Sequence, residues 1–227
     1  MAVEILTATA VNGIITPARG TSSLGLIERL AVPREVLDRQ AELRRRHDAV
    51  VVGSGTVLVD DPSLTSHAGP GQPAVRATLD PGGRIPAGAR FLDGTARTLI
   101  GVTGSTPQSY LDLLAARGVE AVPCRAPGSR PAVEQPEQRA DLALFVAGLA
   151  ARGLSRLLVE GGGRLNRGLL ADGLVDRLHL LVFPAVLDAA SINLFDGPGE
   201  LVRLHLECCE RLGGYLHLTY LVLRGVR

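Results

Sequence analysis

The sequence contains no lysine, so its 24 basic side chains are all arginines, set against 23 acidic ones. Without lysine, neither Schiff-base chemistry nor a Walker-type phosphate lysine is available. The formal net charge of only +1 leaves no surplus to attract a phosphate backbone or anionic lipid. Nucleic acid and membrane surfaces are therefore poor candidate partners, and a small neutral or anionic ligand is favoured.

Cysteine is also scarce, with three residues at Cys124, Cys208 and Cys209. The number is odd, and an adjacent pair supplies neither the spaced ligands of a zinc site nor an ordinary disulfide framework. The first ten residues lack the basic stretch of a signal peptide, and no later run approaches the ~18 uncharged apolar residues of a membrane span. We therefore expect a cytoplasmic protein in a reducing compartment, without a metal site.

Short apolar runs rich in β-branched residues alternate with longer amphipathic stretches, as in a sheet whose strands are joined by helices. The early runs are almost continuously apolar, which is typical of strands covered on both faces. The later runs partly alternate, which suits antiparallel edge strands. We predict strands at Val3–Ala10, Ala49–Val52, Val75–Leu79, Thr98–Val102, Glu120–Val122, Arg156–Val159, Asp176–Val182, Tyr215–Arg224 and, more weakly, Val202–Glu207.

Four helices are predicted between these strands, at Pro33–Arg46, Thr106–Arg117, Glu137–Ala151 and Gly163–Ala171. The length suits one α/β domain over residues 1–227, because a domain of this size buries a single core.

The first motif, Val52-Gly53-Ser54-Gly55-Thr56, follows one of the buried strands. Glycines at the carboxyl end of a strand let backbone N–H groups approach a phosphate or a ring without obstruction by a Cβ atom. Taken alone, the pattern is more typical of a tight turn than of a ligand site.

A second glycine cluster, Glu160-Gly161-Gly162-Gly163, joins a strand to a helix. Free N–H groups at the helix start, reinforced by the helix dipole, make an anion site suited to a pyrophosphate. The glycine spacing is not that of a Rossmann fingerprint, and no acidic residue follows on a second strand. The cluster favours a ligand phosphate over a plain loop.

The third motif is the acidic pair Asp60-Asp61, followed by Pro62, Ser63 and Leu64. An isolated Asp-Asp-Pro is typical of an aspartate cap on a turn. Its distance from the first glycine motif favours a shared site instead.

In order and in spacing, these three motifs resemble the reductase domain of riboflavin biosynthesis, the C-terminal half of a bifunctional deaminase/reductase with a fold like that of dihydrofolate reductase. The resemblance implies a central, mostly parallel sheet flanked by helices, with antiparallel C-terminal strands, and NADPH as the cofactor. It spans nearly the whole chain and is carried by Ala8–Gly13, Leu43-Arg44, His47-Asp48-Ala49, the two glycine motifs, Asp60–Thr65, Leu79-Asp80-Pro81, Arg84-Ile85-Pro86 and Leu169–Val175.

The resemblance also assigns residues to the ligands. The cofactor residues it implies are Ala8, Gly53, Thr56, Asp60, Thr103, Ser105, Gly161, Gly162, Gly163, Arg164, Leu165 and Asn166. The substrate residues are Asn12, Ser22, Arg44, Leu64, His67 and Glu160.

Physical arguments agree with several of these roles. Arg44 offers a guanidinium fork for an anionic or polyhydroxy ligand, and Glu160 lies at the carboxyl end of a strand, where open α/β sheets bind their ligands. As catalytic residues, Glu160 would hold polar groups of the substrate and Asp60 would position cofactor and substrate at their junction. Thr103–Thr106 would hold the adenosine end of the cofactor and its 2′-phosphate.

The sequence departs from the family pattern at several positions. Asn12 replaces an aspartate, Ala10 a serine and Ile14 a basic residue. His67 stands where the family has an arginine that grips the substrate phosphate together with Arg44, and a neutral imidazole lacks that permanently charged fork. The sequence therefore predicts a weaker grip on a phosphorylated ribose, and a modified substrate of a specialised pathway is an alternative.

Two further observations complete the assignment. The zinc deaminase signature, His-x-Glu with Pro-Cys-x-x-Cys, is absent, so we expect a reductase domain alone. His179, His205 and His217 lie in strand patterns and are interpreted as packed or half-exposed sheet residues without a catalytic role.

The predicted reaction is hydride transfer from NADPH to C1 of an opened ribosylamine in its imine form, which gives a ribitylamino product. A protonated imine is already a strong electrophile, so the protein need mainly orient donor and acceptor and exclude water. One alternative is a reductase of the same fold acting on a pterin or another heterocycle. A second is a non-catalytic nucleotide-binding homologue, which need not bind NADPH.

The C-terminal region from Asp176 to Arg224 offers several apolar strands and few helices to cover them. An uncovered apolar sheet face must be buried against something, and a second copy is the favoured partner. We therefore predict a homodimer built through these strands, with contributions from Leu180, Leu181, Val182, Phe183, Leu216, Leu218 and Val222.

Overall fold

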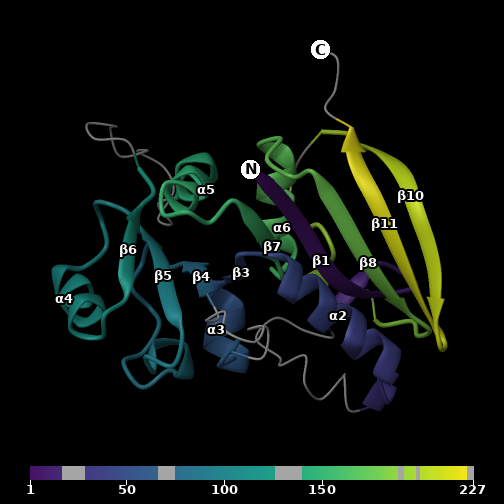
Figure 1. Ribbon diagram of the computed structural model, residues 1–227, viewed down its shortest axis with the longest axis horizontal. Coiled ribbons are helices and arrows are strands. Elements are labelled where there is room, and N and C mark those ends of the chain that lie inside the picture. The colour runs from purple at the N-terminus through teal and green to yellow at the C-terminus, as the bar shows by residue number, and fades with distance from the viewer. Residues whose placement is uncertain (17–28, 66–74, 126–139, 189–191, 198–199, 224–227) are drawn as a thin grey trace.

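In the computed structural model, which describes residues 1–16, 29–65, 75–125, 140–188, 192–197 and 200–223, a nine-stranded sheet runs across the molecule in the order β10-β11-β8-β1-β7-β3-β4-β5-β6 (Figure 1). A two-stranded ladder, β2–β9, lies beside it. The strands are β1 (Ala2–Ala10), β2 (Ile14–Thr16), β3 (Ala49–Gly53), β4 (Val75–Leu79), β5 (Arg97–Val102), β6 (Glu120–Pro123), β7 (Arg156–Val159), β8 (Arg177–Phe183), β9 (Ile192–Asn193), β10 (Arg203–Leu212) and β11 (Tyr215–Leu223).

The sheet is mostly parallel. Strands β8, β1, β7, β3, β4, β5 and β6 pair in parallel, whereas β11 pairs antiparallel with both β8 and β10. The carboxyl ends of the parallel strands therefore share one edge of the sheet, where ligands of open α/β sheets bind. This arrangement confirms the predicted fold class.

Helices cover both faces of the parallel part of the sheet, as its continuous apolar strands require. In β3, Val50 and Val52 join a core with α3 and α4, while Ala49 and Val51 join another with α5 and α6 on the opposite face. A third cluster lies between α2 and the strands β1, β7, β8 and β11. The helices are α2 (Arg34–Arg46), α3 (Ser54–Asp60), α4 (Gln108–Ala116), α5 (Leu142–Ala150), α6 (Gly163–Ala171) and the 3₁₀ turn η1 (Arg90–Leu92).

Helix α3 was not predicted, because the segment after β3 has the composition of a turn. Gly55, Thr56 and Val57 are weak helix formers. Tertiary packing overrides this preference: Val57 is buried in the core beneath the helix, and Asp61 ends it in the left-handed conformation with φ 38°. The first glycine motif is thus a strand-to-helix junction rather than a tight turn.

Other predicted boundaries shift by a few residues. The helix predicted from Thr106 begins at Gln108, after Pro107, and the one predicted from Glu137 begins at Leu142, where the Asp141 side chain accepts a hydrogen bond from the Leu144 N–H at 2.9 Å. The weak strand predicted at 202–207 extends to 212 as β10, and the short strands β2 and β9 were not predicted.

The three antiparallel strands β8, β11 and β10 have two different faces. Leu181 and Phe183 point into the core below α2 and are only 4% and 3% exposed, so the prediction that they contribute to an interface is wrong. On the opposite face, Leu204, Leu206 and Leu216 are exposed. Strand alternation separates the two sets, because neighbouring residues point to opposite sides.

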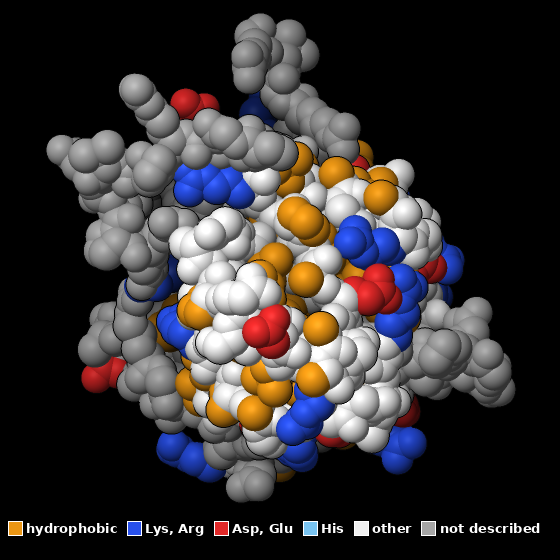
Figure 2. Space-filling view, turned by 90° about the vertical axis from the view of Figure 1, so that its left-hand side faces the viewer, with side chains coloured by type: hydrophobic (Ala, Val, Ile, Leu, Met, Phe, Trp, Pro, Cys, Tyr) orange, Lys and Arg blue, Asp and Glu red, His pale blue; other side chains and the backbone are white. Residues whose placement is uncertain are grey.

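At the other end of the molecule, around β6 and α4, Figure 2 shows hydrophobic side chains in small groups, separated by polar surface and by arginine and acidic side chains. Within the described part of the chain, no helix combines the length and apolar character needed to cross a membrane.

Candidate active site

Glu160 is the centre of the candidate site, directly after β7, where its backbone N–H bonds the Val51 carbonyl of β3 at 2.8 Å. Helix α2 supplies both of its side-chain partners. Arg44 donates through Nε and Nη2 to the two carboxylate oxygens at 2.6 Å each, and Gln40 donates to Oε2 at 3.1 Å. The structure thus brings together two predicted substrate residues that are 116 positions apart in the chain.

The pair is partly shielded from water, with 17% of the Arg44 side chain and 13% of the Glu160 side chain exposed. Burial acts to lower the pKa of Arg44, but the hydrogen bond and charge of Glu160 outweigh it and raise the pKa. Bidentate arginine–carboxylate pairs are geometrically specific. The pair therefore presents a fixed set of polar atoms to a ligand.

The floor of the site lies on β1. Ala8, near the carboxyl end of this inner strand, is exposed although Thr7 and Thr9 on either side are buried. An exposed residue within a sheet that helices otherwise cover marks a hollow in the covering layer. On the same face, Leu6 and Ala10 pack beneath α2, which places the hollow beside the helix that carries Arg44.

Helix α3 positions Thr56 and Asp60, both half-buried, after the open turn at Gly53. A Cβ atom added at Gly53 would meet nothing within 4 Å, so a ligand could approach the backbone here. Beyond α3, Leu64 is buried and holds a positive φ of 50°. These predicted residues lie along one segment at the edge where the parallel strands end.

A buried arginine anchors the loop that carries Leu64. Arg76 on β4 is fully buried; it donates to the Ser63 carbonyl, to Thr98 Oγ1 at 2.9 Å and to Asp93 Oδ1 at 2.7 Å. A hydrogen bond from Thr95 and that from Arg76 lower the Asp93 pKa to about 2, against the effect of burial. The left-handed turn at Leu64 is thereby tied to the sheet.

The loop after β5 forms a separate polar cluster. The hydroxyls of Thr103 and Ser105 lie 2.9 Å apart, and Thr106 Oγ1 accepts from the Thr103 N–H at 3.0 Å. Thr106 Oγ1 donates to the Pro81 carbonyl at 2.8 Å and so joins this loop to the one after β4, where Arg84 donates to Ser54 Oγ at 3.0 Å and its side chain is 59% exposed. Thr103–Thr106 precede α4 rather than opening it, because the helix starts after Pro107.

The triple glycine divides into positions with different surroundings. A Cβ atom at Gly162 would meet nothing within 4 Å, whereas one at Gly163 would lie 2.3 Å from the Asn193 carbonyl oxygen. Gly163 is thus required by packing, and Gly162 faces open space. One turn later Asn166 is fully buried, and neither polar atom of its amide bonds any described residue.

The orphaned amide of Asn166 fits the predicted nicotinamide cofactor. Leaving a buried amide unsatisfied costs about 1–3 kcal/mol, so such groups indicate a missing partner. A ligand with donor and acceptor groups supplies one. With open space at Gly162 and the first N–H groups of α6 directed out of the helix, the residues present suit a phosphorylated, amide-bearing ligand.

Other predicted site residues stand apart from this centre. Ser22 and His67 lie outside the described residues. Asn12 uses its amide to hold the backbone of Leu187, through bonds of 2.7 and 3.3 Å. Arg164 is 68% exposed, and its nearest acidic group is Asp196 at 3.9 Å.

Gln40 is the site residue that the sequence did not reveal. Its only signal is a spacing of four from Arg44, which places both side chains on one face of α2. The histidines divide as predicted into packed and exposed positions: His179 and His217 are buried and His205 is exposed. The described residues contain no group of three or more His, Cys, Asp or Glu that could hold a metal ion.

Comparison with known proteins agrees with this geometry. The model of the RibD C-terminal domain family matches residues 3–218, almost the full length of the chain. The chain belongs to this family. The resemblance on which the site residues were assigned is thereby confirmed at the level of the family.

Two curated relatives carry the same name, 2,5-diamino-6-ribosylamino-4(3H)-pyrimidinone 5′-phosphate reductase. The protein of Methanothermobacter thermautotrophicus is 35% identical over 224 residues, which cover 95% of each chain. That of Archaeoglobus fulgidus is 33% identical over 189 residues, 78% of this chain and 80% of the relative. Among solved structures, a pyrimidine reductase-like protein from Corynebacterium diphtheriae has the same fold, with a TM-score of 0.78, 21% identity, and coverage of 99% of this chain and 92% of the other.

Proposed function

We propose that this RibD-family chain is an NADPH-dependent reductase that converts the ribosylamino side chain of a riboflavin-pathway pyrimidine into a ribitylamino side chain. The names of the two relatives support the reaction and the substrate class. One observation carries the proposal: two kinds of site residue lie at the same edge of the sheet. Glu160 is held there by Arg44 and Gln40. The open position at Gly162 and the unsatisfied amide of Asn166 lie at that edge as well.

The nicotinamide cofactor, when bound, supplies the two electrons and one hydrogen that turn the C1=N double bond of the opened ribosylamine into a single bond. The nitrogen of the protonated imine already holds its proton, so the product amine needs no further proton from the protein. The residues of the chain therefore act mainly by orientation. No strong general acid is required, in keeping with a Glu160 carboxylate that faces two donors.

Glu160 accepts hydrogen bonds, so its remaining lone pairs suit the hydroxyl or amino groups of a ribosylaminopyrimidine. Gln40 and Arg44 fix the carboxylate and leave it oriented before the substrate arrives. Asp60, at the end of α3, is assigned to the junction of cofactor and substrate. Ala8 supplies the floor, because its small side chain leaves room for a planar ring.

We assign NADPH rather than NADH as the cofactor because of the polar cluster in the loop after β5. Only the 2′-phosphate distinguishes the two cofactors, and it needs hydrogen-bond donors and positive charge. Thr103 and Ser105 offer hydroxyl groups, and Arg84 offers an exposed guanidinium next to the same loop. The three groups come from two loops that follow adjacent parallel strands.

The substrate is assigned as the 5′-phosphate, following the relatives, although His67 replaces the family's second phosphate-binding arginine. A neutral imidazole attracts a phosphate less than a guanidinium does. We therefore expect a weaker preference for the phosphorylated form than two arginines would give. His67→Arg should lower KM for the phosphorylated substrate and leave KM for its dephosphorylated counterpart unchanged.

A cytoplasmic homodimer is part of the same proposal. Leu204, Leu206 and Leu216 are exposed apolar side chains on one face of β10 and β11, and β10 is an edge strand of the sheet that the described residues form. A second copy of the chain would cover both. Leu180 and Val182 on β8 lie on the same face, half-buried.

The test is NADPH oxidation by the purified chain against a panel of ribosylaminopyrimidines, with and without the 5′-phosphate, and pterins. We expect turnover with the ribosylaminopyrimidines, and a ribitylamino product by mass spectrometry. Glu160→Gln should reduce kcat/KM by about 100-fold, some 2.7 kcal/mol. Turnover of pterins alone would favour a related reductase, and failure to bind NADPH would favour a non-catalytic homologue.

A further inference from the structure

Helix α2 carries Gln40 and Arg44 to Glu160, so the position of this helix decides how the carboxylate is held. Its apolar anchorage is small: of its 13 residues, only Val36 and Leu43 are buried. Most of the stability of a helix in a protein comes from packing of its apolar face. Polar contacts must therefore contribute much of what fixes α2 on the sheet.

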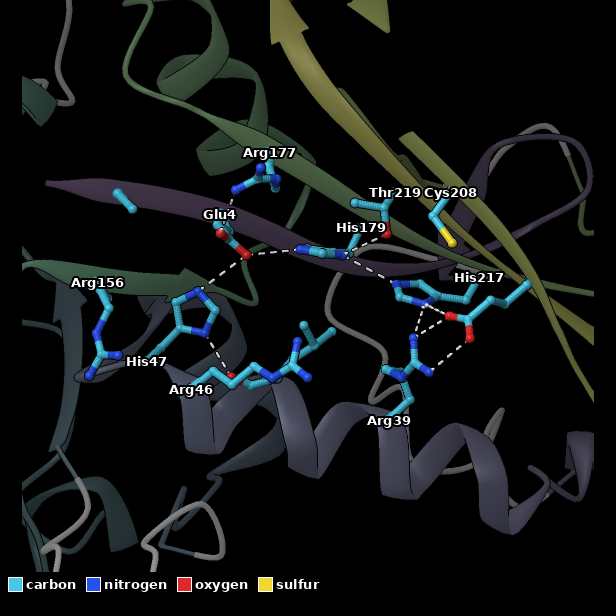
Figure 3. A pocket seen from close by; sticks show the side chains of 13 residues that line it. Glu4, Arg39, Arg46, His47, Arg156, Arg177, His179, Cys208, His217 and Thr219 are labelled. Carbon is cyan, nitrogen blue, oxygen red and sulfur yellow. Dashed lines mark hydrogen bonds and ion pairs between the residues drawn. The ribbon is translucent and has the colours of Figure 1, made fainter. Parts of the chain in front are cut away.

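Those contacts line a cavity of about 330 Å³ between α2 and the sheet (Figure 3). Arg39 Nη1 lies 2.8 Å from His217 Nδ1, and His217 Nε2 lies 3.2 Å from His179 Nδ1. His179 Nε2 lies 2.9 Å from a Glu4 oxygen, which is 3.3 Å from His47 Nε2. We call Arg39, His217, His179, Glu4 and His47 the histidine chain.

Both ends of the histidine chain are attached to the same helix. Arg39 is on α2, and His47 is the residue that ends it, with Nδ1 2.7 Å from the Leu43 carbonyl. The middle members lie on β1, β8 and β11, three adjacent strands. The histidine chain thus runs alongside α2 from Arg39 to His47, the part of the helix that includes Gln40 and Arg44.

The position of the proton on each ring of the histidine chain can be assigned from the hydrogen-bond partners of its nitrogens. Arginine has no acceptor, so Arg39 donates to His217 Nδ1, and the proton of neutral His217 is on Nε2, donated to His179. Neutral His179 then holds its proton on Nε2 and donates it to Glu4. His47 lies between two acceptors, the Leu43 carbonyl at 2.7 Å from Nδ1 and the Glu4 carboxylate at 3.3 Å from Nε2.

An additional proton must break a bond in this arrangement. The remaining ring nitrogens are Nδ1 of His179 and Nδ1 of His217, and each already faces a donor. Protonated His217 would turn from Arg39 toward Glu210, whose carboxylate lies 3.5 Å from Nδ1. His179 Nδ1 also lies 3.2 Å from Thr219 Oγ1.

Other charged groups surround the two histidines. Arg177 bonds Glu207 at 2.8 Å and also lies 3.7 Å from a Glu4 oxygen, and Arg156 bonds Asp48 at 2.7 Å. Arg46 bonds Glu42, and Cys208, on the β10 side of the cavity, is a free thiol. Arg39 also bonds Glu210, so loss of its contact with His217 leaves this arginine joined to β10 through one partly exposed carboxylate.

We propose that the histidine chain is a positioning device that holds α2, and through it the Gln40–Arg44–Glu160 contacts, in the substrate-binding arrangement, and that its protonation releases this arrangement. The proposal rests on the proposed function for its link to the substrate. Its members are positioning residues, because they act through α2. Burial, together with the positive charge of Arg39, lowers the pKa of His217, which favours the intact histidine chain at neutral pH.

The test compares wild type, His217→Leu and the control His205→Leu, which replaces an exposed histidine on β10 outside the chain. Amide hydrogen exchange of α2 is measured near pH 7.5 and near pH 5.5, with α4 as the internal reference and the intrinsic pH effect removed. Steady-state kinetics give KM for the pyrimidine, KM for NADPH and kcat.

In wild type and His205→Leu, we expect the lower pH to reduce protection of α2 relative to α4 and to raise KM for the pyrimidine. In His217→Leu, α2 should be poorly protected at both pH values. Its KM for the pyrimidine should be at least about threefold higher near pH 7.5 and independent of pH, with kcat and KM for NADPH within about twofold.

A folded His217→Leu protein with wild-type α2 protection and wild-type KM would overturn the proposal, even if its melting temperature were lower. If His217→Leu did not fold, the wild-type comparison would decide alone: equal responses of α2 and α4 to pH would overturn it. A pH response of α2 in a protein that reduces no pyrimidine would support the histidine chain and refute the proposed function.

Discussion

The two adjacent glycines at the start of α6 should respond in opposite ways to substitution. Gly162→Val places its side chain where a Cβ meets nothing within 4 Å, and the backbone there (φ −76°, ψ 171°) is open to any residue. Valine is a poorer N-cap than glycine, but it also restricts the unfolded chain. The two effects are each up to about 1 kcal/mol and nearly cancel.

Binding of NADPH should nevertheless weaken in Gly162→Val. The valine side chain fills the approach to the first N–H groups of α6, which the cofactor phosphates are expected to use. We expect Kd to rise by at least about tenfold, which is about 1.4 kcal/mol. Isothermal titration calorimetry measures Kd, and thermal unfolding measures stability on the same samples.

Gly163→Ala is the matched control. Its Cβ would lie 2.3 Å from the Asn193 carbonyl and 2.9 Å from the Asp196 nitrogen, both backbone atoms that must shift. Overpacking of this kind costs about 1–3 kcal/mol, so this variant should lose stability. A stable Gly162→Val protein that binds NADPH as tightly as wild type would refute the placement of the cofactor at the second glycine motif.

Three further perturbations test separate parts of the structure. Ser105→Asp should reduce kcat/KM with NADPH far more than with NADH, because a carboxylate repels the 2′-phosphate; equal losses would contradict the assignment. Leu216→Asp should convert a dimer into a monomer in sedimentation experiments at micromolar concentration, and a wild-type monomer would refute the interface. The free energy of unfolding should fall as the pH drops below 6.5, because the lowered pKa of His217 means that the unfolded chain takes up the proton first; a flat denaturation profile between pH 7.5 and 5.5 would contradict this.

The acid side of the stability profile should continue to decline below pH 4.5. Bonds to His179 and His47 lower the pKa of Glu4 well below this ordinary value, against the effect of burial. A carboxylate with a depressed pKa contributes stability above its unfolded value and loses it as the pH falls. Glu4→Gln should therefore flatten this part of the profile while destabilising the protein at neutral pH.

The parallel part of the sheet was predictable because its strands are buried on both faces. A run such as Ala49–Val52 contains no polar residue, so it is recognised as a buried strand, and the glycine at position 53 marks its end. The C-terminal strands were predicted less well. Strand β10 is exposed along most of its length and carries charges, so hydrophobicity reveals only part of it.

Site residues that belong to family motifs could be predicted from the sequence. Site residues whose role depends on tertiary contacts could not. Glu160 and Arg44 were assigned separately, and the structure joins them. Gln40 carries no motif, since its role depends on a carboxylate 120 residues away. The histidine chain was missed for the same reason: strand alternation shows which face His179 and His217 share, but not that α2 brings Arg39 and His47 to that face.

The exposed methyl group of Ala8 has a consequence for selective inhibition. It lies on β1 between the buried Thr7 and Thr9, so a larger side chain at this position would project away from the core and into the proposed site. We therefore expect a compound with a substituent directed at this methyl group to bind the wild-type protein more tightly than a variant with a bulkier residue there.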